Sequence, residues 1–72
     1  MKQGALVYDE QSGRMDIRFG LEAYYGGLHC GTTMEVFIEE QWRPTRIELS
    51  ANNQWYLVGV PAKQLAGLLV RL

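Results

Sequence analysis

The stretch GALVYDEQSGRMDIRF (residues 4–19) decides the fold class. Its second half, RMDIRF (14–19), alternates charged and apolar residues, and this period of two places the apolar side chains on one face of a strand. The turn residues EQSG (10–13) separate it from a mostly apolar segment at 4–9. We therefore expect two strands joined as a β-hairpin. The apolar side chains of the second strand that share a face are Met15, Ile17 and Phe19.

The rest of the chain continues this pattern of short strands separated by turns. We expect strands at residues 33–39, 42–49 and 55–60, and a short last strand at 68–72. The segment PAKQLAG (61–67) begins with proline and ends with glycine, which predicts one 3₁₀ or α turn. A small sheet covers its edges best by curling. The expected fold is therefore all-β, an SH3-like barrel of five to six short antiparallel strands.

Alternation also assigns faces to the later strands. We expect Phe37 to point outward between two glutamates, and Pro44 to mark an edge or a bulge because it has no N–H to donate. The strand at 55–60 is apolar on both faces, which predicts a central or barrel-closing position. The side chains expected in the core from residues 33–49 are Met34, Val36, Ile38, Thr45, Ile47 and Leu49.

Length and composition limit the class of protein. The chain has 72 residues, a formal net charge of −1 and a single cysteine. This length predicts one domain, residues 1–72. The charge supplies no overall basic field for nucleic acid. No stretch has the apolar length of a membrane span or a secretion signal, so we expect a cytoplasmic protein that does not contact a membrane.

The segment EAYYGGLHCGTT (22–33) lies in a long loop, and long loops in compact domains are often functional. His29 and Cys30 are neighbours, so in an extended segment they point in opposite directions and His29 is badly placed to activate the thiol. Two such residues are also too few for a zinc site. We expect Leu28 and Cys30 to fill the core, and we predict no catalytic residue, metal or cofactor. A thiol enzyme using Cys30 is a minor alternative.

The aromatic residues are too numerous for one small core. Exposed tyrosine and tryptophan beside arginine are typical of protein-interface hot spots, although each ring could instead only cover part of the core. The leading hypothesis is a non-enzymatic protein-interaction module with an unidentified protein partner, present as a monomer or a weak homodimer. The residues predicted to bind the partner are Tyr24, Tyr25, His29, Phe37, Trp42 and Arg46.

Single-stranded nucleic acid is the alternative partner, because aromatic rings can stack on bases while arginines hold phosphates. The carboxylates Glu35, Glu39 and Glu40 lie near two of these arginines in the sequence, and we expect them to form cross-strand ion pairs with Arg43 and Arg46. Such pairing weakens the nucleic-acid hypothesis. The arginines that it would use are Arg14, Arg18, Arg43 and Arg46.

Three motifs carry a resemblance to a known family: YYGGLHCG (24–31), WRPTRIE (42–48) and WYLVG (55–59). The sequence resembles, over nearly its whole length, a family of small bacterial proteins classed as a domain of unknown function. That family is associated with plasmids, phages and integrative elements of Gram-positive bacteria. The resemblance implies a small β-barrel that serves as a cytosolic accessory protein of a mobile element or its host. It implies no activity and no catalytic residue.

Overall fold

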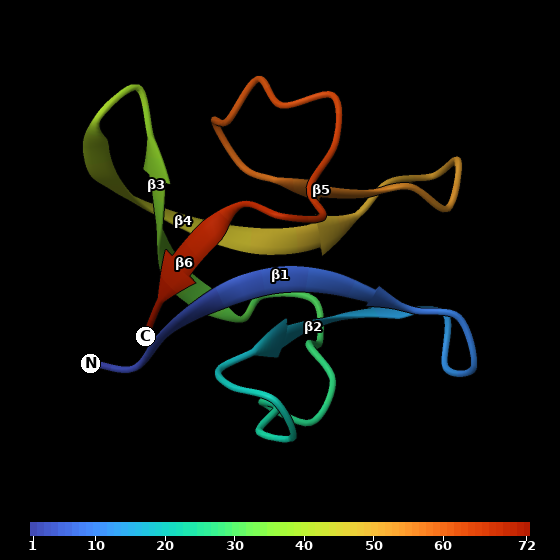
Figure 1. Cartoon of the computed structure of the whole chain (residues 1–72). Helices are drawn as coiled ribbons and strands as arrows, with labels where there is room; N and C mark the ends of the chain where they lie inside the picture. The colour runs from blue at the N-terminus through green and yellow to red at the C-terminus, as the bar shows by residue number, and fades with distance from the viewer.

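A computed structural model describes all 72 residues, with six strands and no helix. Each neighbouring pair of strands is antiparallel, and the sheet has the order β2-β1-β6-β3-β4-β5 (Figure 1). The prediction of an all-β domain is confirmed. The strands are β1 (Gln3–Asp9), β2 (Arg14–Arg18), β3 (Thr33–Ile38), β4 (Gln41–Leu49), β5 (Trp55–Leu57) and β6 (Leu69–Arg71).

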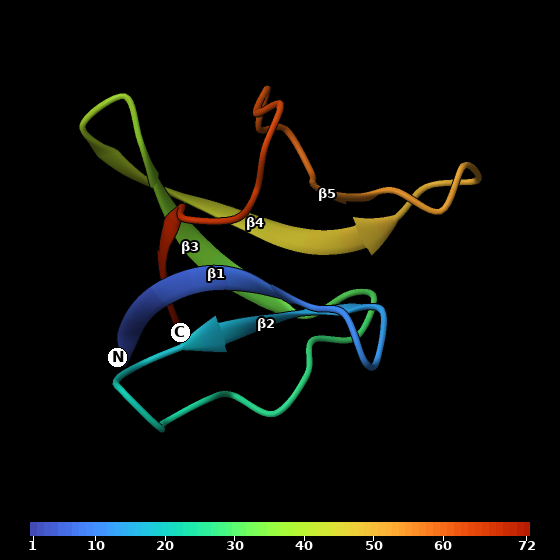
Figure 2. The ribbon, with the colours of Figure 1, turned by 45° about the vertical axis from the view of Figure 1, so that its right-hand side comes forward.

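The sheet is bent but not closed. Its end strands β2 and β5 do not pair with each other, so the closed barrel expected from the sequence is not observed. The β4–β5 pair instead lies above the β1–β2 pair in both views (Figures 1 and 2). A side chain connects the two ends, since the indole N–H of Trp55 donates to the carbonyl of Gly13 at 2.9 Å.

The core lies between these two pairs of strands. The inward assignments of Met15, Ile17, Met34, Val36 and Ile47 are confirmed, because all five are buried. Ile38 and Thr45 are half-buried, and Phe19 packs against the core from its edge. Leu49 lies on the inner face opposite Trp55, as expected, but it is exposed because it ends β4 beside a turn. The other buried side chains are Leu6, Leu28, Leu57, Leu65 and Val70.

The last strand, β6, is the centre of the sheet. It lies between β1 and β3, and Val70 at its middle is fully buried. Its pairing with β1 continues through the amide of Leu6, which donates to the carbonyl of Leu68. A short last strand was expected, but its place between the hairpins follows only from contacts between the two ends of the chain.

The strand expected at 55–60 is shorter and lies elsewhere in the sheet. β5 ends at Leu57, because the amide of Val60 turns back to the Leu57 carbonyl and Gly59 adopts a φ of 77°. β5 is an end strand, so the expected central position is wrong. The apolar side chains of β5 lie on both of its faces, and only those on one face pack against the core. Trp55 and Leu57 pack inward, while Tyr56 is exposed on the outer face, in agreement with the expectation that one of Trp55 and Tyr56 points outward.

No helix forms at residues 61–67, where a 3₁₀ or α turn was expected. One i→i+3 hydrogen bond, from the amide of Leu68 to the carbonyl of Leu65, closes a turn at the end of this segment. Seven residues cannot supply enough internal hydrogen bonds for a stable helix, and here tertiary contacts take the backbone groups instead. The amide of Gly67 donates to the carbonyl of Leu6 on β1, and Leu65 is buried in the core. Proline and glycine at the two ends therefore mark an irregular connection.

The expectation that Pro44 marks an edge is confirmed. Pro44 lies opposite Glu35 of β3. Along an antiparallel strand, successive residues direct their N–H and C=O groups to opposite sides. Ile47 forms its backbone hydrogen bonds with residues 31–32, on the β3 side of β4. Its neighbour Arg46 accepts from the amide of Val58, on the β5 side. By this alternation the nitrogen of Pro44 faces away from β3, where β5 does not reach. The missing N–H therefore costs no ladder hydrogen bond.

Candidate functional site

The long loop covers the outer edge of β2. Tyr24 forms a bridge with Arg18, and the amides of Tyr25 and Leu28 donate to the β2 carbonyls of Ile17 and Met15. The loop then crosses to β4, where the amide of Gly31 donates to the carbonyl of Ile47. This path inserts Leu28 into the core, as predicted. The loop thus has a structural role that the sequence motif alone does not reveal.

Asp16 holds the glycine pair of this loop. Its Oδ1 accepts hydrogen bonds from the amides of Ile17, Gly26 and Gly27 at 2.8, 2.9 and 3.0 Å. The two glycines have φ values of 110° and 99°, which other residues rarely adopt. The GG of YYGGLHCG is therefore explained by a loop anchored to a β2 carboxylate.

We expect Asp16→Ala to lower the free energy of unfolding by about 1–2 kcal/mol, because three amides lose a charged acceptor and water replaces it only in part. Urea denaturation followed by tryptophan fluorescence measures this loss. Asp9→Ala is a matched control, since Asp9 bonds only within its own turn, to Gln11 and Ser12. Equal stability of the two variants would contradict the anchoring role of Asp16.

The prediction that Cys30 is buried is wrong, because Cys30 is an exposed free thiol. The amide and hydroxyl of Thr32 both donate to the carbonyl of His29, so the chain turns here and ends the alternation that began at Leu28. His29 is exposed as well. No group of three or more His, Cys, Asp or Glu side chains is arranged to hold a metal ion.

Two aromatic rings meet on the outer face of β3 and β4. Phe37 and Trp42 are directly opposite in register, with ring centroids 5.1 Å apart. The Arg71 guanidinium of β6 stacks 4.2 Å from the centroid of the Trp42 ring. Its Nε donates to Oε1 of Glu35 at 2.7 Å. We call these four residues, Glu35, Phe37, Trp42 and Arg71, the aromatic face.

The aromatic face points away from the core. Its residues alternate with Val36 and Val70, both of which are fully buried on the inner side. Phe37 is 37% exposed, which confirms the outward assignment, and Trp42 is half-buried beneath its neighbours. The exposed side chains of Pro44 and Leu69 extend the apolar surface on the same side. A compact apolar surface with one arginine is thus open to solvent.

The structure divides the six residues predicted to bind a partner. Phe37 and Trp42 meet in the aromatic face. Tyr24 and Tyr25 are exposed where the loop runs along the outer edge of β2, and His29 is exposed where the loop crosses to β3 and β4. Arg46 lies further along the outer side of β4 and pairs with Glu48 at 2.9 Å. Arg71 is not among the predicted residues, because only the pairing of β6 with β3 places it beside Glu35.

The other arginines are also engaged within the chain. Arg43 pairs with Glu39 at 3.2 Å, as expected, whereas the expected cross-strand pair of Arg46 is wrong because Glu48 on its own strand binds it. Arg14 donates to the carbonyl of Leu28, and Arg18 donates to that of Gly20. Arg14, Arg18 and Arg43 thus tie turns and loops to the sheet, and Arg46 is engaged within β4.

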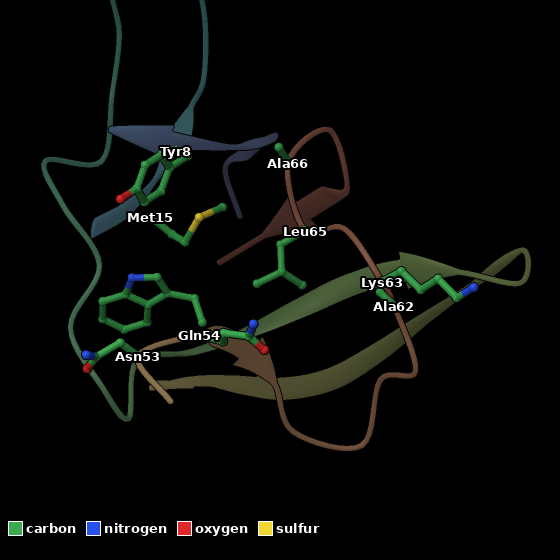
Figure 3. A pocket seen from close by; sticks show the side chains of 9 residues that line it. Tyr8, Met15, Asn53, Gln54, Ala62, Lys63, Leu65 and Ala66 are labelled. Carbon is green, nitrogen blue, oxygen red and sulfur yellow. The ribbon is translucent and has the colours of Figure 1, made fainter. Parts of the chain in front are cut away.

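A groove of about 430 Å³ opens between the β1–β2 hairpin and β5 (Figure 3). Tyr8 and Met15 line it from the hairpin, Trp55 from β5 and Leu65 from the last connection. Four segments that are distant in sequence build this groove, so alternation along single strands could not predict it. Tyr8 and Lys63 stand at opposite ends of the groove. Trp55 lies at the Tyr8 end, which we call the aromatic end, because its indole bonds to Gly13 of the same hairpin.

Residues 4–72 match the model of a domain of unknown function, DUF5348. The chain belongs to the DUF5348 family. The resemblance to a domain of unknown function is confirmed, and the match spans every strand from residue 4 of β1 to β6. A comparison with curated proteins finds no match.

One solved structure resembles this DUF5348 chain closely. It is the crystal structure of a protein from Ruminococcus gnavus, a structural-genomics target. The two chains are 50% identical, with a TM-score of 0.89, over 97% of this chain and 99% of that chain. They therefore share the bent sheet over nearly their whole lengths. The DUF5348 structure described here contains no helix that could span a membrane.

Proposed function

We propose that this DUF5348 domain is a non-enzymatic protein-interaction module that binds its partner through the aromatic face. The observation that carries the proposal is the stacking of Arg71 on Trp42, beside Phe37, on a side of the sheet that faces solvent. Tryptophan and arginine are the residues most enriched in interface hot spots. Rings already packed together lose little conformational entropy when a partner covers them.

The chemistry of Arg71 indicates what the partner offers. Glu35 binds its Nε and Trp42 covers one side of its guanidinium. The two terminal amino groups have no acceptor within the chain. A guanidinium held in this way is prepared to bind a carboxylate. The partner surface therefore combines an acidic side chain with an apolar one that covers Phe37.

Single-stranded nucleic acid has less support as a partner. Arg43 and Arg46 are paired with carboxylates, and Arg14 and Arg18 bind backbone carbonyls of the loop. A phosphate backbone would have to compete with these contacts. Binding to nucleic acid would also weaken steeply with added salt, which gives a direct way to distinguish it.

Three expectations drawn from the sequence are part of the proposal: the SH3-like relationship, the cytoplasmic accessory role and the weak homodimer. The order of hairpin, long loop and three-stranded meander supports an SH3-like relationship by analogy of fold. We also propose, from the family resemblance alone, a cytoplasmic accessory role for a mobile element or its bacterial host. If the partner is a second copy of this chain, the same face forms a weak homodimer.

The test is affinity capture from a bacterial lysate treated with nuclease. We expect Phe37→Ala/Trp42→Ala to abolish capture of the partner that the wild type retains, because both hot-spot rings are removed. Tyr24→Ala/Tyr25→Ala examines the loop, where three of the predicted residues lie. Tyr56→Ala is the matched control, since Tyr56 is exposed on the outer side of β5, away from the aromatic face.

Thermal melts establish that each variant is folded, and sedimentation reports self-association. Partner loss in Phe37→Ala/Trp42→Ala alone supports the aromatic face. Retention of every partner by a folded Phe37→Ala/Trp42→Ala protein would contradict it, and loss in Tyr24→Ala/Tyr25→Ala would move the interface to the loop. Partners that only nuclease releases would favour the nucleic-acid alternative.

A further inference from the structure

The groove between the hairpin and β5 is separate from the aromatic face. Trp55 and Met15 belong to the inner side of the sheet, whereas Phe37 and Trp42 belong to the outer side. The floor of the groove is Met15 and Leu65, which are both buried, and Tyr8 stands at one end (Figure 3). Trp55 lines the same end, where its indole bonds to the hairpin. Apolar grooves with a few polar groups at the rim are the usual form of a binding site.

The aromatic end of the groove is held in place before any ligand arrives. The indole N–H of Trp55 donates to the carbonyl of Gly13, the last residue of the β1–β2 turn. This bond fixes the Trp55 ring relative to the hairpin that carries Tyr8. Binding therefore does not require the two sides of the groove to close, and an ordered pocket lowers the entropic cost of binding.

The backbone of Trp55 is unpaired at the rim. The amide of Val58 donates to Arg46, and the amide of Ser50 donates to the carbonyl of Gln54. By the alternation of an antiparallel ladder, even-numbered residues of this strand bond to β4 and Trp55 directs its N–H and C=O away from it. No strand of the sheet lies on that side of β5 to bond to either group. One residue of an extended peptide could bond to both.

The other end of the groove is basic. Six of the seven basic side chains contact a carboxylate, a carbonyl or an aromatic ring, and Lys63 is the seventh. No carboxylate lines the groove. Figure 3 shows Lys63 at the end opposite Tyr8. Its ammonium group points away from Leu65 (Figure 3), but Lys63 is exposed and its side chain can turn toward a ligand that lies along the groove.

We infer that the groove binds an extended segment of a partner protein that carries an apolar side chain followed by an acidic residue. The apolar side chain lies on Met15 and Leu65 between Tyr8 and Trp55. The main chain of the segment bonds to the free N–H and C=O of Trp55, as in the addition of a strand to a sheet edge. The acidic residue reaches Lys63. This second site does not depend on the aromatic face.

The probe is the best peptide selected on the wild-type protein from a phage-displayed library of random peptides, with Kd measured by fluorescence polarisation. We expect Tyr8→Ala and Lys63→Glu each to weaken binding by about tenfold or more, equivalent to about 1.4 kcal/mol. Replacing the acidic residue of the peptide with lysine should restore binding to the Lys63→Glu variant. Tyr8 is exposed, so its loss leaves the fold intact.

Two controls match these variants. Lys2→Glu makes the same charge change away from the groove, where Lys2 lies over Phe19, and Tyr56→Ala removes an exposed tyrosine from the opposite side of β5. Both should leave Kd unchanged. Hydrogen exchange provides an independent measurement, because the Trp55 amide should exchange more slowly in the complex than in the free protein.

The following results would overturn the inference or a stated part of it. Unchanged Kd in Tyr8→Ala and Lys63→Glu would exclude the groove, and loss of binding in Phe37→Ala/Trp42→Ala would assign the peptide to the aromatic face instead. Failure of the charge reversal to restore binding would remove the acidic residue from the proposal. A library that yields no binder would reject peptide binding in the groove, while lysate capture still tests the aromatic face separately.

Discussion

Leu28→Ala is expected to lower the free energy of unfolding by about 3–5 kcal/mol, the range for a buried leucine that leaves a cavity. Leu28 is fully buried although it lies in a loop, and its amide donates to the carbonyl of Met15 at 2.8 Å. The side chain therefore fastens the loop to the core. A domain of this size has a total stability of only about 4–11 kcal/mol, so the variant is close to unfolding.

Urea denaturation monitored by tryptophan fluorescence measures this change. Leu21→Ala is the matched control, because Leu21 lies in the same loop and is 86% exposed. The control should change stability by less than about 0.5 kcal/mol. If Leu28→Ala denatured at the same urea concentration as Leu21→Ala, the loop would not be held by Leu28.

The second large effect is expected for Gly4→Ala, at about 3 kcal/mol of lost stability, the upper range for overpacking. A Cβ at position 4 would lie 2.5 Å from the carbonyl oxygen of Arg18 and 2.8 Å from Cγ2 of Ile17. Gly4 pairs with Val70 of β6 on its other side. Strands on both sides therefore prevent β1 from moving away, and the clash includes backbone that cannot change rotamer.

Gly20→Ala is the control for this change. The nearest atom to a Cβ at position 20 would be the Cβ of Ala23 at 3.8 Å, an ordinary contact. It should leave stability unchanged or raise it slightly, because alanine restricts the unfolded chain. Thermal melts of the two variants side by side distinguish the effects. Equal melting temperatures of the Gly4→Ala and Gly20→Ala proteins would show that β1 can shift away from β2.

The candidate site shows where sequence reasoning succeeds and where it stops. Alternation within one strand placed Phe37 outward, and the hairpin that pairs β3 with β4 brings Trp42 beside it. Arg71 completes the aromatic face from the other end of the chain, and no local pattern indicates that contact. Cys30 shows the opposite error, because a turn at residues 29–32 ended the alternation on which its assignment relied.

The sequence by itself determined the all-β class, the β1–β2 hairpin, the faces of β2 and β3 and the edge at Pro44. These features follow from a period of two and from turn residues, which act between neighbours in the chain. Tertiary structure alone decided the central place of β6, the open ends of the sheet, the irregular connection at residues 61–67 and the groove. Those features depend on contacts between distant segments, whose free energy is gained only when the whole core is assembled.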